Sequence, residues 1–549
     1  MPHPRLLLPA LCLLGLTTYA QAPLPQWHHL DPADKAMGIS TDRAYELLRT
    51  LPNKPKARPI IVAVIDGGID TAHVDLRHVL WHNPKEIPAN GRDDDHNGYV
   101  DDVFGWNFTG GADGRNVFEN QKEDTRLYAR LKPLYEHKTA ATVPPAKQAE
   151  FRLYEQAKKS YTTNRAKAEA AYQQDSQELA GDLGRVAALK KAYGVAVLDS
   201  GLLHHPPTLA DTALTKLTAQ YYRWVRGKFP NLDTLANQYI RYNAGLKRRL
   251  DYDYNLAYNP QPLVGDHPND LTERHYGNNN LRTDPRDHGT EHGTHCTGII
   301  AADRTNNLGV RGVAEQVRIL GVRAIPNGDE RDKDVANAIR YAVDNGASII
   351  SMSFAKYFSP EKNIVDEAMR YANAKGVLLV HGAGNDHLNY DSIPAFPSTR
   401  FLNGQTIPNL ITVGASARTN DERLVATFSN YGPKTVDVFA PGVDIISTYP
   451  NNQYHSGSGT SMAAPVVAGI AAVLKVNFPH LTHADLKRII LASAAPVHTQ
   501  VRKPGTKQLV DFATLSRTGG IVNLYEAVRL ASLTPVPAVT VSAKDRSGK

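Results

Sequence analysis

The stretch Gly459-Thr460-Ser461-Met462-Ala463-Ala464-Pro465, which runs on into Val466–Leu474, places a hydroxyl between a Gly-rich approach and an apolar segment of small residues. Glycines let another backbone come close, and a helix start offers free N–H groups and the positive end of its dipole. Pro465 suits the first turn of such a helix. The pattern favours a nucleophile at Ser461. A Gly/Ser loop ahead of a buried core helix is the alternative that this stretch alone leaves open.

Two other stretches favour the nucleophile. Residues 61–70 form a β-branched apolar run that ends in Asp66 at a glycine turn. This predicts a buried strand with a carboxylate at its carboxyl end, where open α/β sheets place their sites. Residues 292–300 put His292 at the head of another small-residue helix. Asp, His and Ser in this chain order match one known order of the catalytic triad.

With these three blocks present in order, the chain resembles the subtilisin-like serine peptidases, the subtilase family. The resemblance implies that Ser461 is the nucleophile, His292 the general base and Asp66 the group that orients His292. The family motif uses the first His of His-Gly-Thr-His, so His292 is preferred to His295. The implied fold is α/β, with three layers and a mostly parallel sheet flanked by helices. Alternating strands and helices between residues 299 and 530 independently predict such a sheet.

The same resemblance suggests how the substrate is held. Residues 377–385 read as a strand that delivers Asn385, whose side-chain N–H and the backbone N–H of Ser461 are expected to form the oxyanion hole. The expected substrate-binding residues are Ser351, Ser353, Phe354, Ala355, Ala383 and Gly384. Recognition along an extended main chain predicts broad specificity. Ala355 stands where relatives commonly have Gly, and His381 where they have a small residue, so no preferred side chain is predicted.

An acidic loop between residues 91 and 102 predicts a structural Ca²⁺ site. Oxygen ligands recur at alternating positions, with Gly98 for a sharp turn, as in an EF-hand-like loop. The expected ligands are Asp93, Asp95, Asn97, the Tyr99 carbonyl and Asp101. The closing Glu is missing, because Phe104 stands at position 12. Similar loops in related subtilases bind Ca²⁺; a solvated acidic turn is the alternative.

Composition limits the other classes of function. The formal charge of +7 is spread over 549 residues without a concentrated basic run, so no nucleic-acid partner is predicted. Residues 1–20 read as a signal peptide, which predicts an exported protein, extracellular or periplasmic. No later stretch is apolar for about 20 residues, so no membrane span is predicted. Without the signal, Cys296 is the one remaining cysteine, and no intrachain disulfide is expected.

Asp66 and His292 are more than 200 positions apart, against a few tens in compact subtilases. We therefore expect a peptidase domain made of residues 58–110 and 281–533, interrupted by a helical insertion at 111–280. Helical spacing within the insertion is clearest at 151–171, 177–193 and 209–250. Residues 21–57 form an N-terminal segment, and residues 534–549 a Pro/Ser/Lys-rich tail that is expected to be disordered. The insertion either gates access of substrate or braces the fold.

The leading hypothesis is an exported endopeptidase that cuts protein or peptide substrates through an acyl-enzyme. Two alternatives belong to other classes. One is a catalytically silent subtilase fold that serves as a binding module. The other is an acyl transferase or peptide ligase that uses the same triad, since water and amines compete for one acyl-enzyme. The sequence predicts no oligomeric state.

Overall fold

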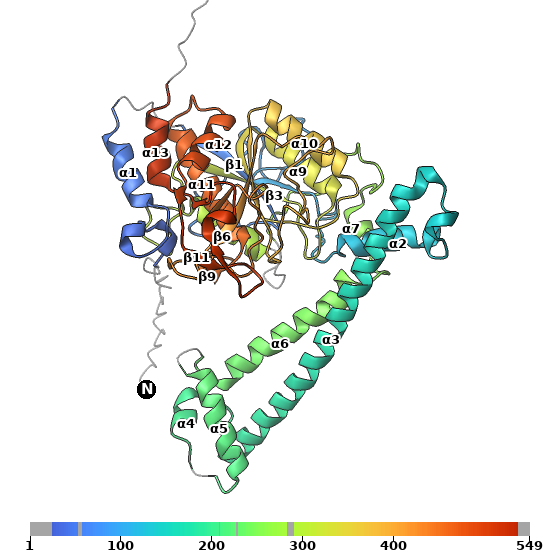
Figure 1. The fold of residues 1–549 in the computed structure, drawn as a ribbon, viewed down its shortest axis with the longest axis vertical. Helices are drawn as coiled ribbons and strands as arrows, with labels where there is room; N and C mark the ends of the chain where they lie inside the picture. The colour runs from blue at the N-terminus through green and yellow to red at the C-terminus, as the bar shows by residue number, and fades with distance from the viewer. Residues whose placement is uncertain (1–24, 53–57, 208, 227–228, 283–289, 536–549) are drawn as a thin grey trace, which may run out of the picture.

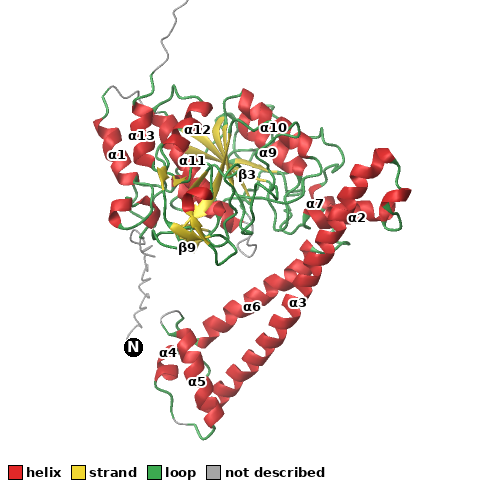
Figure 2. Ribbon diagram, viewed as in Figure 1, coloured by secondary structure: helices red, strands yellow, loops and turns green. Residues whose placement is uncertain are grey.

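The computed structural model describes residues 25–52, 58–207, 209–226, 229–282 and 290–535. The predicted signal peptide and residues 536–549 of the predicted tail lie outside the described residues. Figure 1 shows two parts: a rounded body that contains the sheet, and a long helical arm that leads away from it. Figure 2 shows that the strands belong to the body and that the arm is helical.

A nine-stranded sheet runs through the described part of the body, in the order β10-β13-β7-β6-β5-β4-β1-β3-β2. Neighbouring strands are parallel except for the edge pair β10–β13. A mostly parallel sheet is what the sequence predicts. Its strands are β1 (Ile60–Asp66), β2 (Gly105–Asn107), β3 (Val317–Arg323), β4 (Ala347–Met352), β5 (Leu378–Gly382), β6 (Leu410–Ser416), β7 (Val438–Pro441), β10 (Ala495–Pro496) and β13 (Gly520–Ile521).

Helices cover both faces of the sheet, because side chains that alternate along β1 pack into apolar clusters on opposite faces. Val62 and Val64 pack into one apolar cluster, and Ala63 and Ile65 into another on the opposite face. The first cluster lies under α1 (Thr41–Thr50), α8 (Glu291–Ala301), α11 (Thr460–Asn477), α12 (His483–Ala492) and α13 (Leu524–Ser532). The second lies under α9 (Asp332–Asp344) and α10 (Lys362–Ala374). A strand buried on both faces reads as a continuous apolar run, which is why β1 was predictable.

Helix α11 lies at the centre of the body. Its small residues let it pack against its neighbours: a Cβ on Gly469 would stand 2.6 Å from Cβ of Val313. Among the described helices, α11 is long and apolar enough to cross a membrane, but 89% of that window is buried inside the protein. It is a core helix.

The arm contains α2 (Glu123–Tyr135), α3 (Gln148–Tyr193), α4 (Ser200–His204), α5 (Thr212–Val225), α6 (Leu232–Arg248), a π-helical turn (Arg249–Asp253) and α7 (Gln261–Val264). Helices α3 and α6 lie side by side, and α4 and α5 form the far tip (Figure 1). One apolar cluster lies at the root, around Phe151 and Tyr154, and a second lies at the tip, around Leu189 and Tyr221. The chain leaves and re-enters the body at one place, where Asn107 and Asn278 form an antiparallel bridge.

Several elements differ from the sequence expectation. The two helices expected at 151–171 and 177–193 are one 46-residue helix, α3, because no proline interrupts the segment between them. The structure adds two antiparallel hairpins, β8 (Ile445–Tyr449) with β9 (Gln453–Gly457) and β11 (Gln500–Arg502) with β12 (Leu509–Asp511). It also has short 3₁₀ turns at Trp27–His29, Pro32–Asp34, Ala140–Thr142, Pro145–Lys147 and Phe512–Thr514.

Candidate active site

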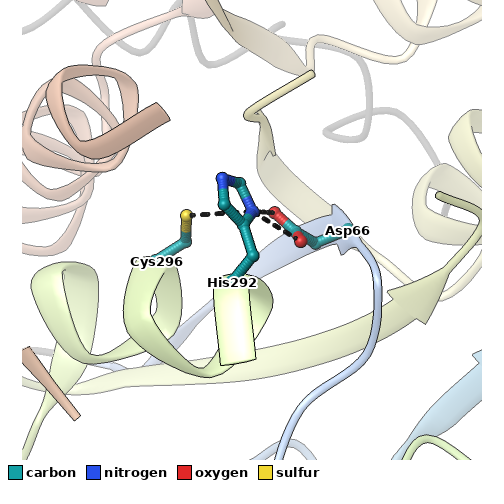
Figure 3. Close-up of side chains that lie close together, drawn as sticks. All are labelled: Asp66, His292 and Cys296. Atoms are coloured by element: carbon teal, nitrogen blue, oxygen red, sulfur yellow. Dashed lines mark hydrogen bonds and ion pairs between the residues drawn. The ribbon is translucent and has the colours of Figure 1, made fainter. Parts of the chain in front are cut away.

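Asp66 and His292 meet at the carboxyl edge of the sheet (Figure 3). Asp66 ends β1 and is 3% exposed, and His292 lies in the first turn of α8. Nδ1 of His292 lies 2.8 Å from Oδ1 and 3.0 Å from Oδ2 of Asp66. Oδ1 also accepts the N–H of Gly67 at 2.7 Å, which fixes the carboxylate. The pair therefore has the geometry in which a carboxylate holds an imidazole in one tautomer.

The charge of Asp66 changes the pKa of His292, the candidate general base. Desolvation by the surrounding protein acts to lower the pKa of His292, but the negative charge of Asp66 outweighs it and raises that pKa well above its ordinary value. The imidazole side chain remains 43% exposed, so one side of the ring is open to solvent. An imidazolium formed during a reaction would be stabilised here.

Ser461 lies beside this pair in the first turn of α11. The thiol of Cys296 links them: its Sγ donates to the carbonyl of Ser461 at 3.3 Å and lies 3.9 Å from Nδ1 of His292. Oγ of Ser461 donates to the carbonyl of Ser353 at 3.1 Å, and no hydrogen bond joins this hydroxyl to His292 within the described residues. Attack on a substrate thus requires the hydroxyl to turn from Ser353 toward the imidazole, a rearrangement usual for sites without substrate.

Asp66, His292 and Cys296 also place potential metal-ligand atoms within 4.8 Å of one another. Burial, the first cause, raises the pKa of the Cys296 thiol, so it stays protonated near neutral pH, whereas a thiol ligand must be a thiolate. The same Nδ1 of His292 faces both other residues. These features favour an orienting pair with a packed thiol over a metal site.

Asn385 follows β5 and faces the start of α11. Its Oδ1 accepts the backbone N–H of Thr460 at 2.9 Å and the Thr460 hydroxyl at 3.1 Å. These bonds fix which end of the amide is oxygen. Among the described residues no hydrogen bond engages Nδ2, which leaves it as a donor beside the backbone of Gly459.

The expected substrate segment, residues 351–355, divides into two parts. The expectation that Ser351 pairs with substrate is wrong. Ser351 is 1% exposed, and its backbone pairs with Val64 of β1 and Val380 of β5. It lies inside the sheet and has no free edge for a substrate. The sequence pattern misses this because register depends on neighbouring strands. Ser353, Phe354 and Ala355 follow the end of β4, beyond the paired residues.

The other expected pocket residues lie on the facing loop. Ala383 is fully buried and donates its N–H to Val413, while the N–H of Gly384 donates to the Thr460 hydroxyl at 3.0 Å. His381 lies between the two segments, with Nε2 2.8 Å from the carbonyl of Phe354. Burial lowers the pKa of His381 to about 4, so it is neutral at physiological pH. His381 therefore fixes the Phe354 backbone without adding charge to the pocket.

In the acidic loop the structure gathers a different ligand set from the expected one. Asp93, Asp95 and Glu86 place oxygen atoms within 4.8 Å of one another. Oε1 of Glu86 accepts the N–H groups of Asp94 and Asp95, while its buried Oε2 has no partner among the described residues. Burial raises the pKa of Glu86. An orphaned carboxylate oxygen beside two further carboxylates fits a hard cation such as Ca²⁺. Sequence spacing missed Glu86 because it precedes the loop.

The remaining loop residues shape the turn. Both carboxylate oxygens of Asp101 accept backbone N–H groups, from Asn90 at 3.1 Å and Gly91 at 2.8 Å. Asp101, which was expected to be a ligand, is not among the residues whose oxygen atoms gather around Glu86. The Asn97 oxygen accepts the N–H of Tyr99 at 2.8 Å. Gly98 has φ +93°, and a Cβ there would run into the ring of His275, so this turn requires glycine.

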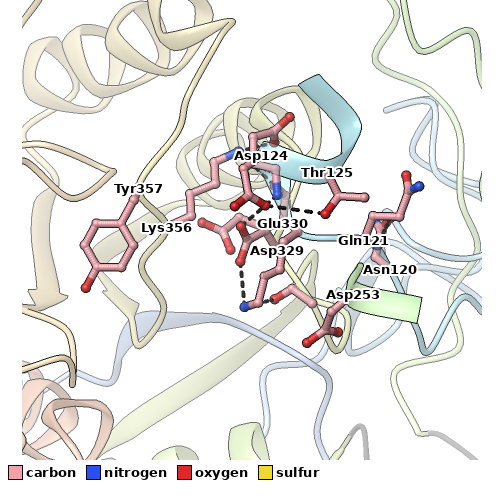
Figure 4. Close-up of polar contacts among 12 residues, drawn as sticks. Asn120, Gln121, Asp124, Thr125, Asp253, Asp329, Glu330, Lys356 and Tyr357 are labelled. Atoms are coloured by element: carbon pink, nitrogen blue, oxygen red, sulfur yellow. Dashed lines mark hydrogen bonds and ion pairs between the residues drawn. The ribbon is translucent and has the colours of Figure 1, made fainter. Parts of the chain in front are cut away.

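A buried ion-pair network joins the arm to the substrate segment (Figure 4). Lys356, which follows Ala355, is 2% exposed; its Nζ lies 2.9 Å from both Oε2 of Glu123 in α2 and Oδ1 of Asp332. Arg126 binds the same Glu123 carboxylate and the carbonyls of Asp329 and Glu330. The root of the arm is thus anchored at Lys356, directly after the expected substrate segment 353–355, a connection that the sequence does not reveal.

The model of the subtilase family, Peptidase_S8, matches residues 190–519, which include His292, Asn385 and Ser461. The thermophilic serine proteinase of Bacillus sp. (strain AK1) is 43% identical over 184 residues, 33% of this chain and 42% of that protein. Thermitase of Thermoactinomyces vulgaris is 43% identical over 187 residues, which are 34% of this chain and 61% of that protein. Subtilisin Savinase of Lederbergia lenta is 35% identical over 200 residues, which are 36% of this chain and 68% of that protein.

The match thus spans about two-fifths to three-fifths of the first two relatives. The family model covers more than half of this chain, and the body has the mostly parallel, helix-flanked sheet described above. The chain belongs to the subtilase family.

Proposed function

We propose that the chain is an exported serine endopeptidase that hydrolyses peptide bonds of proteins with broad specificity. The observation that carries the proposal is the buried Asp66 carboxylate bonded to Nδ1 of His292, with Ser461 next to the pair at the start of α11. The relatives' names, which include a proteinase, thermitase and a subtilisin, support a peptidase.

In the proposed reaction, Oγ of Ser461 attacks the carbonyl carbon of the scissile bond while His292 removes the hydroxyl proton. Asp66 stabilises the resulting imidazolium. The oxyanion of the tetrahedral intermediate accepts hydrogen bonds from Nδ2 of Asn385 and the backbone N–H of Ser461. His292 then gives its proton to the leaving amine, and the C–N bond breaks. Water attacks the acyl-enzyme by the same steps and releases a free carboxylate.

The substrate segment available for pairing is residues 353–355. Their position past β4, opposite Gly384, supports binding of an extended chain between the two segments. Recognition through main-chain atoms supports broad specificity. His381 lies next to Phe354 and is neutral, so it adds no charge that would select charged substrate side chains.

We also propose that a Ca²⁺ ion stabilises the acidic loop, held by Glu86, Asp93 and Asp95. When bound, the ion would neutralise carboxylates that repel one another and leave Oε2 of Glu86 no longer orphaned. It takes no part in the chemistry of Ser461. Export through residues 1–20 belongs to the same proposal and rests on sequence alone.

The domain organisation that we propose is a peptidase domain of residues 58–110 and 281–533, with the arm inserted at 111–280. The Asn107–Asn278 bridge supports this, since both ends of the insertion meet there, with N···O distances of 2.8 and 3.0 Å. We favour a brace over a gate for the arm, because buried charges fasten its root to the body.

Steady-state cleavage of casein and of a fluorogenic peptide tests the function. Ser461→Ala should lower kcat by about 10⁶-fold. Ser458→Ala, three residues upstream and bonded only to the Asp444 region, is the matched control and should keep full activity. Equal activity of wild type and Ser461→Ala would contradict the proposal, and a wild type that is folded but inert would favour the silent binding module.

A further inference from the structure

A cavity of about 310 Å³ lies at the root of the arm, apart from the candidate active site. One wall comes from α2, another from the loop around Leu256 and Leu271, and a third from Arg331, which precedes the first turn of α9. The volume is enough for a small organic molecule. Apolar side chains, among them Leu127, line part of it.

Arg331 has no counter-ion in this cavity. Its Nε is buried without a hydrogen-bond partner, and no ion pair joins its guanidinium to any residue that the structure describes. Burial, followed by the charge of Arg126, lowers the pKa of Arg331. A guanidinium nonetheless stays protonated, because its ordinary pKa is so high. The charge therefore persists, and Asp334, Glu123 and Asp266 offset it through space without a direct ion pair in the part of the chain that the structure describes.

The carboxylates around the cavity are already engaged. Asp266 lies 2.8 Å from Nζ of Lys333, and Glu361 lies 2.9 Å from Nη1 of Arg130. Glu123 binds Arg126 and Lys356, and Asp332 binds Lys356 and the Ser359 hydroxyl at 2.8 Å. Each of these carboxylates thus has its own direct partner. Arg331 is partly buried, and its buried Nε lacks a hydrogen-bond partner among the described residues, so an anion that reaches the cavity could supply one.

We propose that this cavity binds an organic carboxylate, with the carboxylate against Arg331 and the apolar part against Leu127, Leu256 and Leu271. The planar guanidinium matches a carboxylate through two parallel hydrogen bonds. The leucines favour a ligand with a hydrocarbon portion over a bare inorganic oxyanion. Asp332 of the same wall binds Lys356, which follows the proposed substrate segment 353–355. A ligand in the cavity would therefore restrict the motion of that segment.

N-acetyl-leucine is the probe, because it joins a carboxylate to an apolar side chain; N-acetyl-leucinamide is the same molecule without the charge. Both are titrated by calorimetry and by thermal melting into the full chain carrying Ser461→Ala, so the readout does not involve catalysis. The comparison variants are Arg331→Gln, Arg331→Lys and the matched control Arg318→Gln, whose side chain is exposed on β3.

The expected result is a saturable rise in melting temperature with N-acetyl-leucine and none with the amide. Arg331→Gln should weaken binding at least about tenfold, Arg331→Lys less, and Arg318→Gln not at all. Without ligand, Arg331→Gln should melt no lower than its parent, since it removes an uncompensated charge.

Three results would overturn the proposal. The first is equal binding of the acid and the amide. The second is equal binding of the acid by the parent and by both Arg331 variants. The third is binding of inorganic phosphate as tight as that of N-acetyl-leucine, which would make the site a general oxyanion site without a role for its apolar wall.

Discussion

Helices α11 and α3 represent two different ways of building a helix into this protein. Helix α11 buries fifteen of its 18 residues, and its polar end presents Ser461. Helix α3 buries seven of its 46 residues, five in its first half between Phe151 and Ala168 and two, Val186 and Leu189, near its C-terminal end. The middle of the arm therefore depends on helix propensity and surface pairs, whereas α11 depends on tertiary packing. The body can hold reacting groups in fixed geometry, whereas the arm is fastened at its root by buried ion pairs.

The largest effect should come from the carboxylate of the body. Asp66→Asn keeps the shape of the side chain but no longer stabilises the charged imidazole, so we expect kcat to fall about 10⁴-fold. The matched substitution in the arm, Asp182→Asn, removes the charge that pairs with Arg185 at 2.6 Å and should leave kcat unchanged. Peptide hydrolysis by the two variants measures both. A similar loss from both would mean that the arm takes part in the chemistry.

The next effect should come from the junction. Lys356→Met leaves Glu123 and Asp332 buried without their shared cation, at a cost of about 3–5 kcal/mol in the free energy of unfolding. Lys191→Met, exposed on the arm, is the control and should cost little. Urea unfolding of each variant gives the values. An unchanged Lys356→Met protein would show that the root is not anchored by charge.

Calcium should stabilise the body by a comparable amount. At a free concentration of about 100 Kd, bound Ca²⁺ adds about 2.7 kcal/mol to the free energy of unfolding. Glu86→Gln should remove most of this gain, whereas Asp94→Asn should keep it, because Asp94 bonds to Ile87 and Asn90 outside the cluster. Melting with and without a chelator tests this, and an equal gain in both variants would reject Glu86 as a ligand.

Acid should weaken the body through the N-terminal segment. Burial, followed by the charge of Arg304, lowers the pKa of His29 to about 3, against about 6.5 in the unfolded chain. Between these values the unfolded state binds a proton that the folded state does not. This stabilising contribution is complete above pH 6.5 and falls on acidification by about 1.4 kcal/mol per pH unit.

His29→Gln can keep the contacts to Thr41 and the Arg311 carbonyl, so the slope between pH 6.5 and 5 should become shallower. Urea unfolding at several pH values measures it. An identical slope in wild type and variant would contradict the assignment.

The smallest effect should come from the tip of the arm. Tyr221 donates to Asp182 at 2.9 Å, so Tyr221→Phe should cost about 1 kcal/mol. Hydrogen exchange at α5 should report this loss, while kcat stays at the wild-type value. A loss of kcat would indicate that the tip acts on the cleft.

Features written in local patterns were predictable from the sequence. The apolar run of β1 predicted a strand buried on both faces. The glycines before α11 and the small residues within it predicted the position of Ser461. Features that depend on distant neighbours were not. Ser351 is enclosed because β1 and β5 pair with it, and Glu86 joins Asp93 through a fold-back outside the loop spacing. Strand β9 of the β8–β9 hairpin is largely exposed and lacks a clear apolar alternation.

The most direct test of the central claim is to locate the residue that a fluorophosphonate probe modifies. The full chain is labelled, digested and analysed by mass spectrometry, with Asp66→Asn labelled in parallel. We expect a single adduct on Ser461 in the wild type and much slower labelling of Asp66→Asn. An adduct on another serine, or equal labelling rates in the two proteins, would contradict the assignment of Asp66, His292 and Ser461 as one catalytic unit.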